Sequence, residues 1–470
     1  MNDERDFDSA DLQAQYRGGC GVESISMDDE VPEKLPDSAY VLKDGERKNF
    51  PENPKNVLPD NKPLREKTSQ EIVDQLSKML KQYAERLKKP ENIEKLAKSS
   101  GESEDMVKFD IKIIEKMSDK ELLSSWLKDG GTDLGKYMEE WVEAEGYLQK
   151  AAPLGRGVNI NAGHNIGAVV VPEIWRVLSG NSVLHKMPSN DKVTLEILHK
   201  VYQEYENEIT ETCKIGYWPG GSEEMEKNLF SADYVMAWGD DSTIASIRGK
   251  VSPTTRFIPF HFEFGAYLVD KETQENYEEE LLERIAKDFS WGDQLLCFSP
   301  LVMIVEETEN TEEFLKDLSK TLEEYTEKYS PGVVPEDEEM NIARTKKMAR
   351  DMGNLVSDWD NHTTVIEKRG LERSDISEFH SFRFVKAHKV ENLEEALETV
   401  GSVRNLQEFI LATEKSRRRE LREKILRTHA KRIVSPGGAP PTLSIPWDGK
   451  HPVSELLRWV TDEEHQEHQN

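Results

Sequence analysis

The stretch Asp288-Phe-Ser-Trp-Gly-Asp-Gln-Leu-Leu-Cys-Phe-Ser-Pro300 leads from a predicted helix into a predicted buried strand. The helix is expected over about residues 276–287, and the strand over the apolar, β-favouring run 301–305. Cys297 therefore lies where the chain enters a strand. A nucleophilic cysteine needs partial exposure and nearby backbone N–H groups, whereas a packing cysteine usually lies inside an apolar run. On this stretch alone, an inert buried thiol remains the simpler interpretation.

Strand-like and helical segments alternate on both sides of Cys297. Before it, strands are expected at 158–160, 182–186, 215–217, 234–238 and 256–260. After it, the alternation continues with a helix over 311–329 and a strand over 386–390. Strand–turn–helix repeats of this length predict parallel βαβ units, which bind ligands at the carboxyl ends of their strands. The predicted fold class is therefore α/β.

The first third of the chain has a different character. Residues 1–60 are polar and acidic, and we expect them to be loosely ordered. From Lys67 the apolar residues recur at helical spacing, and Thr68 with Glu71 has the pattern of a capping box. A further helical stretch is expected over about 134–148. This part of the chain is predicted to be a helical region in which the apolar stripes form core.

Composition excludes several classes of protein. The chain has 470 residues with a formal net charge of −29, which argues against binding to nucleic acid or anionic membranes. Its three cysteines, Cys20, Cys213 and Cys297, are too few and too widely spaced for a disulfide framework or a zinc site. The N-terminus lacks a signal-peptide core, and no apolar run approaches the ~18 to 20 residues of a membrane span. We expect a cytoplasmic protein that has no structural metal and no membrane span.

A basic run near the C-terminus stands out in so acidic a chain. Its members are Lys415, Arg417, Arg418, Arg419, Arg422, Lys424, Arg427, Lys431 and Arg432. A helix with a solvated or internally paired charged face is the favoured interpretation. A phosphate-binding or subunit-contact role is the alternative.

Four stretches taken together resemble the aldehyde dehydrogenase superfamily, and within it the LuxC-type acyl-CoA reductases. They are residues 162–189, 220–247, 288–305 and the closing Trp-Asp-Gly-Lys-His-Pro at 447–452. The resemblance implies a Rossmann-type cofactor domain beside an α/β catalytic domain. The expected division is 1–60 loose N-terminus, 61–150 helical region, 151–262 cofactor-binding domain, 263–432 catalytic domain and 433–470 C-terminal segment.

The resemblance also implies roles for three catalytic positions. Cys297 matches the family's nucleophile, and Asn165 in Gly-His-Asn-Ile-Gly matches the asparagine that helps form the oxyanion hole. Glu263 matches the glutamate with which hydrolytic aldehyde dehydrogenases activate water. LuxC-type sequences usually lack that glutamate, so its presence leaves open whether the acyl-enzyme is reduced or hydrolysed.

Five further positions match the superfamily's cofactor site. Lys186 and Ser189 match the positions that hold the adenosine ribose, while Gly239, Ser242 and Thr243 match the turn and helix start at the pyrophosphate. A helix N-terminus offers free N–H groups to an anion. Serine at 189 replaces the glutamate common in NAD-preferring relatives and removes its repulsion of a 2′-phosphate, so NADPH is expected in preference to NADH.

The expected activity is the NADPH-dependent reduction of a long-chain fatty acyl-CoA, or another acyl thioester, to the aldehyde through an acyl-enzyme on Cys297. The alternative is an aldehyde dehydrogenase that oxidises free aldehydes to acids, using Glu263 for hydrolysis. An acyl-activating synthetase is the expected protein partner. By analogy with the superfamily, we expect a homo-oligomer in which the segment after Val434 packs on a partner.

Overall fold

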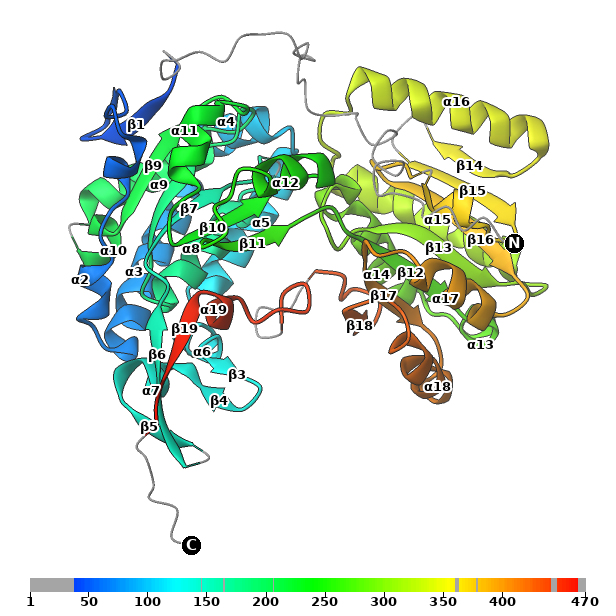
Figure 1. The fold of residues 1–470 in the computed structure, drawn as a ribbon. Coiled ribbons are helices and arrows are strands. Elements are labelled where there is room, and N and C mark those ends of the chain that lie inside the picture. Colours follow the sequence, from blue (N-terminus) through cyan, green and yellow to red (C-terminus); the bar gives the residue numbers. More distant parts are fainter. Residues whose placement is uncertain are drawn as a thin grey trace, which may run out of the picture.

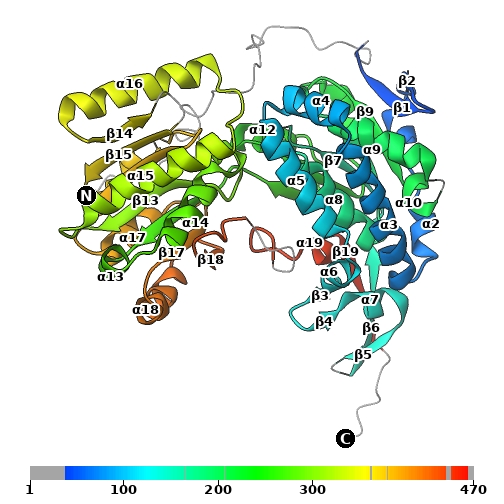
Figure 2. The same ribbon diagram turned by 180° about the vertical axis from the view of Figure 1, so that it is seen from behind.

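The computed structural model describes residues 38–144, 146–163, 165–205, 207–359, 363–377, 379–440 and 446–463. These residues form two lobes that lie side by side, each built around a seven-stranded sheet (Figures 1 and 2). The chain passes from the first lobe to the second after residue 260, and its red C-terminal part returns to the first lobe (Figure 1).

The sheet of the first lobe contains the five parallel strands that the sequence predicts. Their order is β11 (Arg256–Phe260), β10 (Tyr234–Trp238), β7 (Arg156–Ile160), β8 (Ser182–Lys186) and β9 (Cys213–Tyr217). The helices that connect or flank them are α8 (Gly167–Leu178), α9 (Val193–Glu204), α10 (Glu208–Glu211), α11 (Glu223–Leu229) and α12 (Asp241–Arg248). This arrangement confirms the predicted parallel βαβ units.

Helices from the first third of the chain cover one side of this lobe. They are α2 (Lys62–Arg65), α3 (Ser69–Leu87), α4 (Pro90–Ser100), α5 (Glu104–Met117), α6 (Lys120–Ser125) and α7 (Leu134–Glu139). The Thr68–Glu71 capping box at the start of α3 is confirmed, with both of its hydrogen bonds present. Because α3 and α5 pack on α8, this layer fixes the segment that carries Asn165.

The described part of the segment expected to be loosely ordered contains regular structure. Within the segment expected to be loose, η1 (Pro54–Val57) is a 3-10 turn, and β1 (Tyr40–Lys43) pairs antiparallel with β9 and with β2 (Glu46–Lys48). Its side chains Tyr40, Val41 and Leu42 are buried, and this burial orders the segment. Residues 1–37, which include Cys20, lie outside the described part.

The helix expected over 134–148 ends at residue 139. The chain then forms β5 (Val142–Ala144) and β6 (Tyr147–Pro153), and β6 pairs antiparallel with β19 (Leu457–Asp462). The segment expected on a partner thus completes a three-stranded sheet in its own chain, after the short helix α19 (Pro452–Glu455). A two-stranded ribbon of β3 (Lys128–Asp129) and β4 (Thr132–Asp133) lies nearby.

The second lobe has the same layered plan. Its sheet runs β14 (Leu355–Trp359), β15 (Thr363–Arg369), β16 (Phe384–Val390), β13 (Pro300–Glu306), β12 (Phe264–Val269), β17 (Leu406–Ala412) and β18 (Arg432–Val434), and only β14 pairs antiparallel. One hydrophobic cluster joins the sheet to α14 (Glu279–Ser290) and α15 (Thr311–Lys328). A second joins its other face to α17 (Leu393–Gly401) and α18 (Lys415–Ile425). The remaining elements are α13 (Lys271–Glu275), η2 (Trp291–Gln294), α16 (Glu336–Met352) and η3 (Arg373–Ser377).

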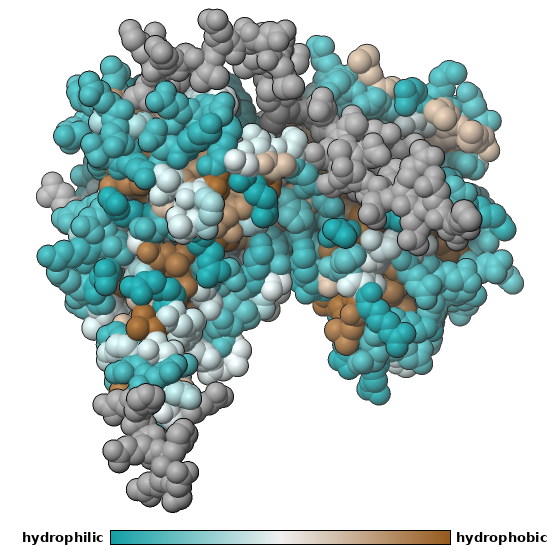
Figure 3. Space-filling view, in the orientation of Figure 1, coloured by the Kyte–Doolittle hydropathy of each residue, from teal (hydrophilic) through white to brown (hydrophobic). Residues whose placement is uncertain are grey.

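The surface is mainly hydrophilic, and a notch opens between the lobes on the face shown in Figure 3. Near this boundary, the Asn405 amide donates to Asp241 Oδ2 at 3.1 Å and to the carbonyl of Phe262 at 2.8 Å. The closing segment also ties the lobes, because Lys450 Nζ donates to the carbonyl of Pro259 at 2.8 Å. Among the described residues, no helix has the length and apolar character that a membrane crossing requires.

Candidate active site at the lobe boundary

Cys297 lies three residues before β13, the strand at the centre of the second sheet. The turn that delivers it has left-handed backbone at Gly292, Asp293 and Gln294, with φ of 57°, 49° and 63°. Two non-glycine residues hold this strained conformation because their side chains are fixed. The Gln294 amide donates to the carbonyls of Pro300 at 2.8 Å and Phe384 at 3.1 Å. Asp293 is ion-paired with the buried Arg383 at 3.0 Å.

The Cys297 side chain is partly exposed, with its thiol beside Gln407 and Asp448. Gln407 Nε2 donates to Cys297 Sγ at 3.7 Å and also to Asp448 Oδ1. Burial raises the pKa of the Cys297 thiol well above its ordinary value; the Asp448 carboxylate raises it further and the Gln407 amide opposes the rise. At rest the site therefore holds a neutral thiol, and attack requires loss of its proton.

Asp448 reaches this position from the closing Trp-Asp-Gly-Lys turn. Asp448 and Gly449 have positive φ of 49° and 70°, and Trp447 and Lys450 exchange backbone hydrogen bonds of 2.8 and 2.9 Å. Trp447 packs against Trp175 and Trp238 of the first lobe, at ring-centroid distances of 5.6 and 6.3 Å. Sequence reasoning used this motif only to identify the family and assigned no role to Asp448, Gln407 or Lys431.

Glu263 lies in the same constellation but is already paired. Its side chain is only 2% exposed and is ion-paired through Oε1 with Lys431, while His261 Nε2 lies 3.6 Å from the same oxygen. The backbone N–H of Lys431 donates to the carbonyl of Gln407 at 2.8 Å, which places the pair beside the Cys297 neighbours. Lys431 belongs to the basic run that was expected to be solvated or paired with acidic groups, and it pairs with this buried carboxylate.

Asn165 lies just before α8 and contacts acidic side chains. Asn165 Nδ2 donates to Asp110 Oδ2 at 2.5 Å and to Glu102 Oε1 at 3.4 Å, and Oδ1 accepts from the N–H of Ala168 at 3.2 Å. Among the described residues, no hydrogen bond joins Asn165 directly to Cys297. The connection is indirect, because Asp110 also accepts from the indole N–H of Trp291 in the Cys297 turn, at 3.4 Å.

The predicted ribose-binding residues lie at and after the end of β8. Lys186 is 8% exposed, with Nζ donating to the carbonyl of Met187 at 3.4 Å and lying 5.7 Å from the centre of the Tyr217 ring. Lys192 Nζ lies 3.8 Å from the centre of the same ring. Burial lowers the pKa of Lys186 to about 8; Glu226 opposes this shift and Lys192 adds to it. Ser189 is exposed three residues beyond Lys186.

Gly239, Ser242 and Thr243 come together where β10 leads into α12. A Cβ on Gly239 would lie only 2.9 Å from the side chain of Thr243, so this close turn favours glycine. Asp240 caps the helix, since its Oδ1 accepts from the N–H of Thr243 at 2.6 Å and from Ser242 Oγ at 2.8 Å. The helix start expected to meet a pyrophosphate thus already carries a carboxylate, which the motif match overlooked.

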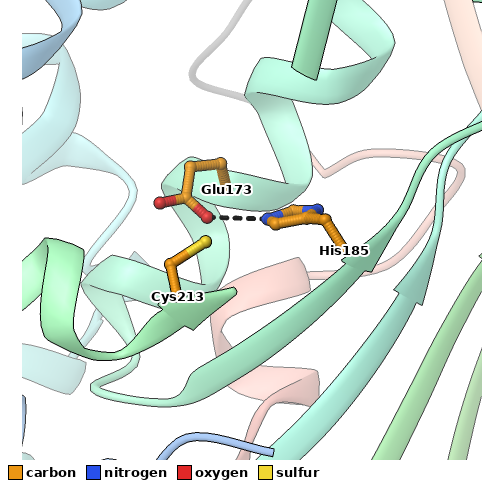
Figure 4. A group of neighbouring side chains, drawn as sticks. All are labelled: Glu173, His185 and Cys213. Carbon is orange, nitrogen blue, oxygen red and sulfur yellow. Dashed lines mark hydrogen bonds and ion pairs between the residues drawn. The ribbon is translucent and has the colours of Figure 1, made fainter. Parts of the chain in front are cut away.

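A second polar cluster is buried in the first lobe. Glu173, His185 and Cys213 offer ligand atoms that lie within 4.8 Å of one another (Figure 4). Arg176 Nε donates to Glu173 Oε2 at 2.7 Å, and His185 Nε2 lies 2.9 Å from the same oxygen. Because Arg176 already neutralises Glu173, a divalent cation would have to compete with a guanidinium. We interpret the cluster as an ion-pair network that fixes α8 to β8 and β9.

The basic run agrees largely with the favoured interpretation. Arg417 pairs with Glu394 and Glu306, and Arg418 donates to the carbonyls of Val434 and Ile433. Most of the other basic side chains of α18 are exposed.

Comparison with known proteins identifies the family. The family described as Acyl-CoA reductase (LuxC) matches residues 64–459, which is most of the chain. The chain belongs to the LuxC acyl-CoA reductase family. It is 28% identical over 167 residues to long-chain acyl-protein thioester reductase 2 of Photobacterium leiognathi, and 24% identical over 166 residues to the long-chain acyl-protein thioester reductase of Photorhabdus laumondii subsp. laumondii. Each match covers 34% of this chain and 34% of the relative, so the chain spans about a third of the length of the curated relatives it matches.

Solved structures confirm the aldehyde dehydrogenase-like fold of this LuxC-family chain. The salicylaldehyde dehydrogenase of Pseudomonas putida G7 aligns with a TM-score of 0.64 at 15% identity, covering 86% of this chain and 88% of that one. The lactaldehyde dehydrogenase of Escherichia coli aligns with a TM-score of 0.63 at 12% identity, with the same coverage. The predicted fold class is therefore correct.

Proposed function

We propose that this protein reduces a long-chain fatty acyl thioester to the aldehyde with NADPH, through an acyl-enzyme on Cys297. The observation that carries the proposal is the position of Cys297 in a LuxC-family chain: a partly exposed cysteine on a rigid turn before the central strand of the second lobe. The matched relatives are named long-chain acyl-protein thioester reductases, which favours an acyl group carried on a thiol.

The proposed reaction begins when the Cys297 thiol loses its proton and attacks the thioester carbonyl. The Asn165 amide and the backbone N–H of Cys297 stabilise the oxyanion, and one such donor typically lowers the barrier by about 3 to 4 kcal/mol. The bond from carbonyl carbon to carrier sulfur then breaks, and the carrier leaves as its thiol. Bound NADPH supplies the hydride that reduces the acyl group. Breaking the bond to Cys297 Sγ releases the aldehyde, and the thiolate takes up a proton from solvent to restore the resting thiol.

The Glu263–Lys431 pair favours reduction over the alternative hydrolytic activity. A general base must reach the proton of an attacking water, but Glu263 is buried and its Oε1 is held by Lys431. We therefore propose that Glu263 holds Lys431 beside Gln407 and Asp448 rather than activating water.

Mixing the protein with palmitoyl-CoA in the absence of nicotinamide is expected to attach one palmitoyl group to Cys297. Intact-protein mass spectrometry with peptide mapping measures this, and the buried Cys213 is the internal control because it should stay unmodified. Added NADPH should then clear the adduct as hexadecanal.

Two outcomes would contradict the proposal. Loss of the adduct as palmitate without NADPH, slowed by Glu263→Gln, would establish the hydrolytic alternative. No adduct from palmitoyl-CoA or from a palmitoyl-carrier-protein thioester would remove Cys297 as the nucleophile.

The preference for NADPH is proposed from the surroundings of Lys186. This buried amine has a carbonyl at 3.4 Å, aromatic rings and Lys192 as neighbours, so it suits an added anion such as a 2′-phosphate. Lys186 and Ser189 would hold the adenosine ribose with its phosphate, and the turn at Gly239 would face the pyrophosphate.

Lys186→Ala is expected to raise the KM for NADPH by roughly tenfold to a hundredfold, because the variant loses one charge-assisted hydrogen bond to the 2′-phosphate. The KM for NADH should change less, and the exposed Lys200→Ala is the matched control. Steady-state kinetics with both cofactors measures the effect. A wild-type enzyme that prefers NADH, or equal effects on both cofactors, would contradict the assignment.

The remaining expectations belong to the same proposal. The acyl donor is acyl-CoA or an acyl carrier, supplied by an acyl-activating synthetase, and the enzyme acts in the cytoplasm as a homo-oligomer.

A further inference from the structure

Asp110 is a carboxylate that the family resemblance did not mark and that lies on the apolar face of α5. It is 3% exposed among the buried Val107, Ile111 and Ile114. Burying a carboxylate among apolar side chains costs free energy unless hydrogen bonds compensate. The hydrogen bonds to its oxygens come from two neutral donors, the amide of Asn165 and the indole of Trp291. Both donors belong to the proposed active site.

The two donors bind different oxygens of Asp110 and come from different lobes. Asn165 Nδ2 donates to Oδ2 at 2.5 Å, and Trp291 Nε1 donates to Oδ1 at 3.4 Å. The Trp291 ring also packs edge-on against Phe109, with ring centres 4.6 Å apart. It packs at a tilt against Phe298, the neighbour of Cys297, with ring centres 5.5 Å apart. A single carboxylate therefore connects the Asn165 segment of the first lobe with the Cys297 turn of the second.

The bond to Asp110 also fixes which end of the Asn165 amide faces which way. A carboxylate accepts from the NH2 end only, while the N–H of Ala168 donates to the oxygen end at 3.2 Å. One hydrogen of Nδ2 is taken by Asp110, and the other makes only the longer, 3.4 Å contact with Glu102. That second hydrogen is the one that a developing oxyanion could take.

We propose that Asp110 is a positioning residue of the active site, which holds the NH2 end of Asn165 in register with the Cys297 turn. This inference rests on the proposed role of Asn165 in stabilising the oxyanion. Asp110 touches neither substrate nor cofactor in this role, and acts through the orientation of Asn165.

The charge of Asp110 depends on its surroundings. Burial raises its pKa to about 7, while Trp291 and Asn165 oppose the rise. Burial likewise raises the pKa of Glu102, with Asp110 and Asp293 adding to it. Asp293 is paired with Arg383. Ionised Asp110 accepts stronger hydrogen bonds than the neutral acid. Its hydrogen bond with the Asn165 amide should therefore strengthen as the pH rises through about 7.

The test is a double-mutant cycle on the rate of Cys297 acylation, followed as single-turnover release of CoA from palmitoyl-CoA. Asn165→Ala should slow acylation by roughly a hundred- to a thousandfold, the usual loss of one oxyanion donor. Asp110→Ala should slow it by less, because Asn165 is then still present but less well oriented. Because Asp110 acts through Asn165, the acylation rate of the double variant should lie within about twofold of the rate of Asn165→Ala. Asp110→Asn keeps the shape of the side chain and should recover part of the rate. Its rate should rise with pH only through deprotonation of Cys297, without the added rise near pH 7 that ionisation of Asp110 gives. Asp105→Asn on the same helix is the control, since Asp105 pairs with Lys108 at 3.5 Å and, among the described residues, makes no hydrogen bond with Asn165 or Trp291.

Four outcomes would overturn the inference. Multiplying effects in the double variant would give Asp110 a role independent of Asn165, as would an unchanged pH profile in Asp110→Asn. A wild-type rate in Asn165→Ala would remove the proposed oxyanion role and the inference with it. A wild-type rate in Asp110→Ala with a slow Asn165→Ala would remove the inference alone.

Discussion

Replacing Cys297 with alanine is expected to lower kcat/KM for acyl-thioester reduction by at least about 10⁴-fold, as loss of a covalent nucleophile does in other enzymes. The remaining donors could still bind the carbonyl oxygen, but no acyl-enzyme could form. Aldehyde formation from palmitoyl-CoA and NADPH, followed by NADPH absorbance, measures the effect. Binding of NADPH should stay near wild type, because its proposed residues lie in the first lobe.

Cys213→Ser is the matched control for this prediction. Cys213 is buried at the start of β9, and burial raises the pKa of its thiol well above the ordinary value. A buried thiol of this kind is inert, so the control should retain turnover. If Cys297→Ala kept more than about one per cent of wild-type turnover, the reaction would not need an acyl-enzyme on Cys297, and the proposal would be contradicted.

The strands were predictable because local patterns determine them. The run 234–238 is apolar throughout and stops at Gly239, and β10 covers those same residues. β8 likewise matches its expected bounds of 182–186. In both strands every residue is buried, and in β10 the apolar run and the strand coincide.

Contacts between distant segments were not predictable. β6 and β19 are separated by about 300 residues, and neither carries a signal for its partner. The helix predicted over 134–148 includes β5 and only the first two residues of β6. Pairing of β6 with β5 and β19 makes this part of the chain strand instead. The strand β1 was also not predictable, because its three buried side chains lie within an acidic and polar segment.

In the candidate site, too, sequence motifs indicated some residues, while others were found only from the fold. Family motifs located Cys297, Asn165 and Glu263 in the sequence, but not the groups that set their chemistry. Gln407 and Asp448 meet at the Cys297 thiol from the start of β17 and from the closing turn. Lys431 looked like one more member of a basic run, and only the fold brings it to Glu263.

Arg176→Met is expected to destabilise the first lobe by about 3 to 5 kcal/mol, the usual cost of breaking a buried ion pair. Arg176 and Glu173 are each only 1% exposed, and Arg176 also donates to Thr212 Oγ1 at 2.7 Å. Removing the guanidinium leaves the Glu173 carboxylate buried without its main counter-charge. Urea denaturation followed by tryptophan fluorescence measures the loss. Adding Glu173→Gln should recover part of it, because no uncompensated carboxylate then remains.

The pH dependence of this loss has a definite sign. In the wild type, Arg176 and His185 hold the pKa of Glu173 at about 2 although burial opposes them, against an ordinary value of 4.5. The pair therefore stabilises the wild type above pH 4.5, and this contribution is lost as the pH falls toward 2.

In Arg176→Met, burial should raise the pKa of Glu173, so acidification should favour folding. The difference between the two proteins should be largest at high pH and shrink as the pH falls. Above pH 4.5 it shrinks because Glu173 of the variant becomes protonated, and below pH 4.5 because the wild type loses the contribution of its ion pair. The exposed helical pair Arg284–Glu280 supplies the control, and Arg284→Met should be nearly neutral at every pH. A deficit independent of pH would mean that Arg176 stabilises the lobe through packing rather than through its charge.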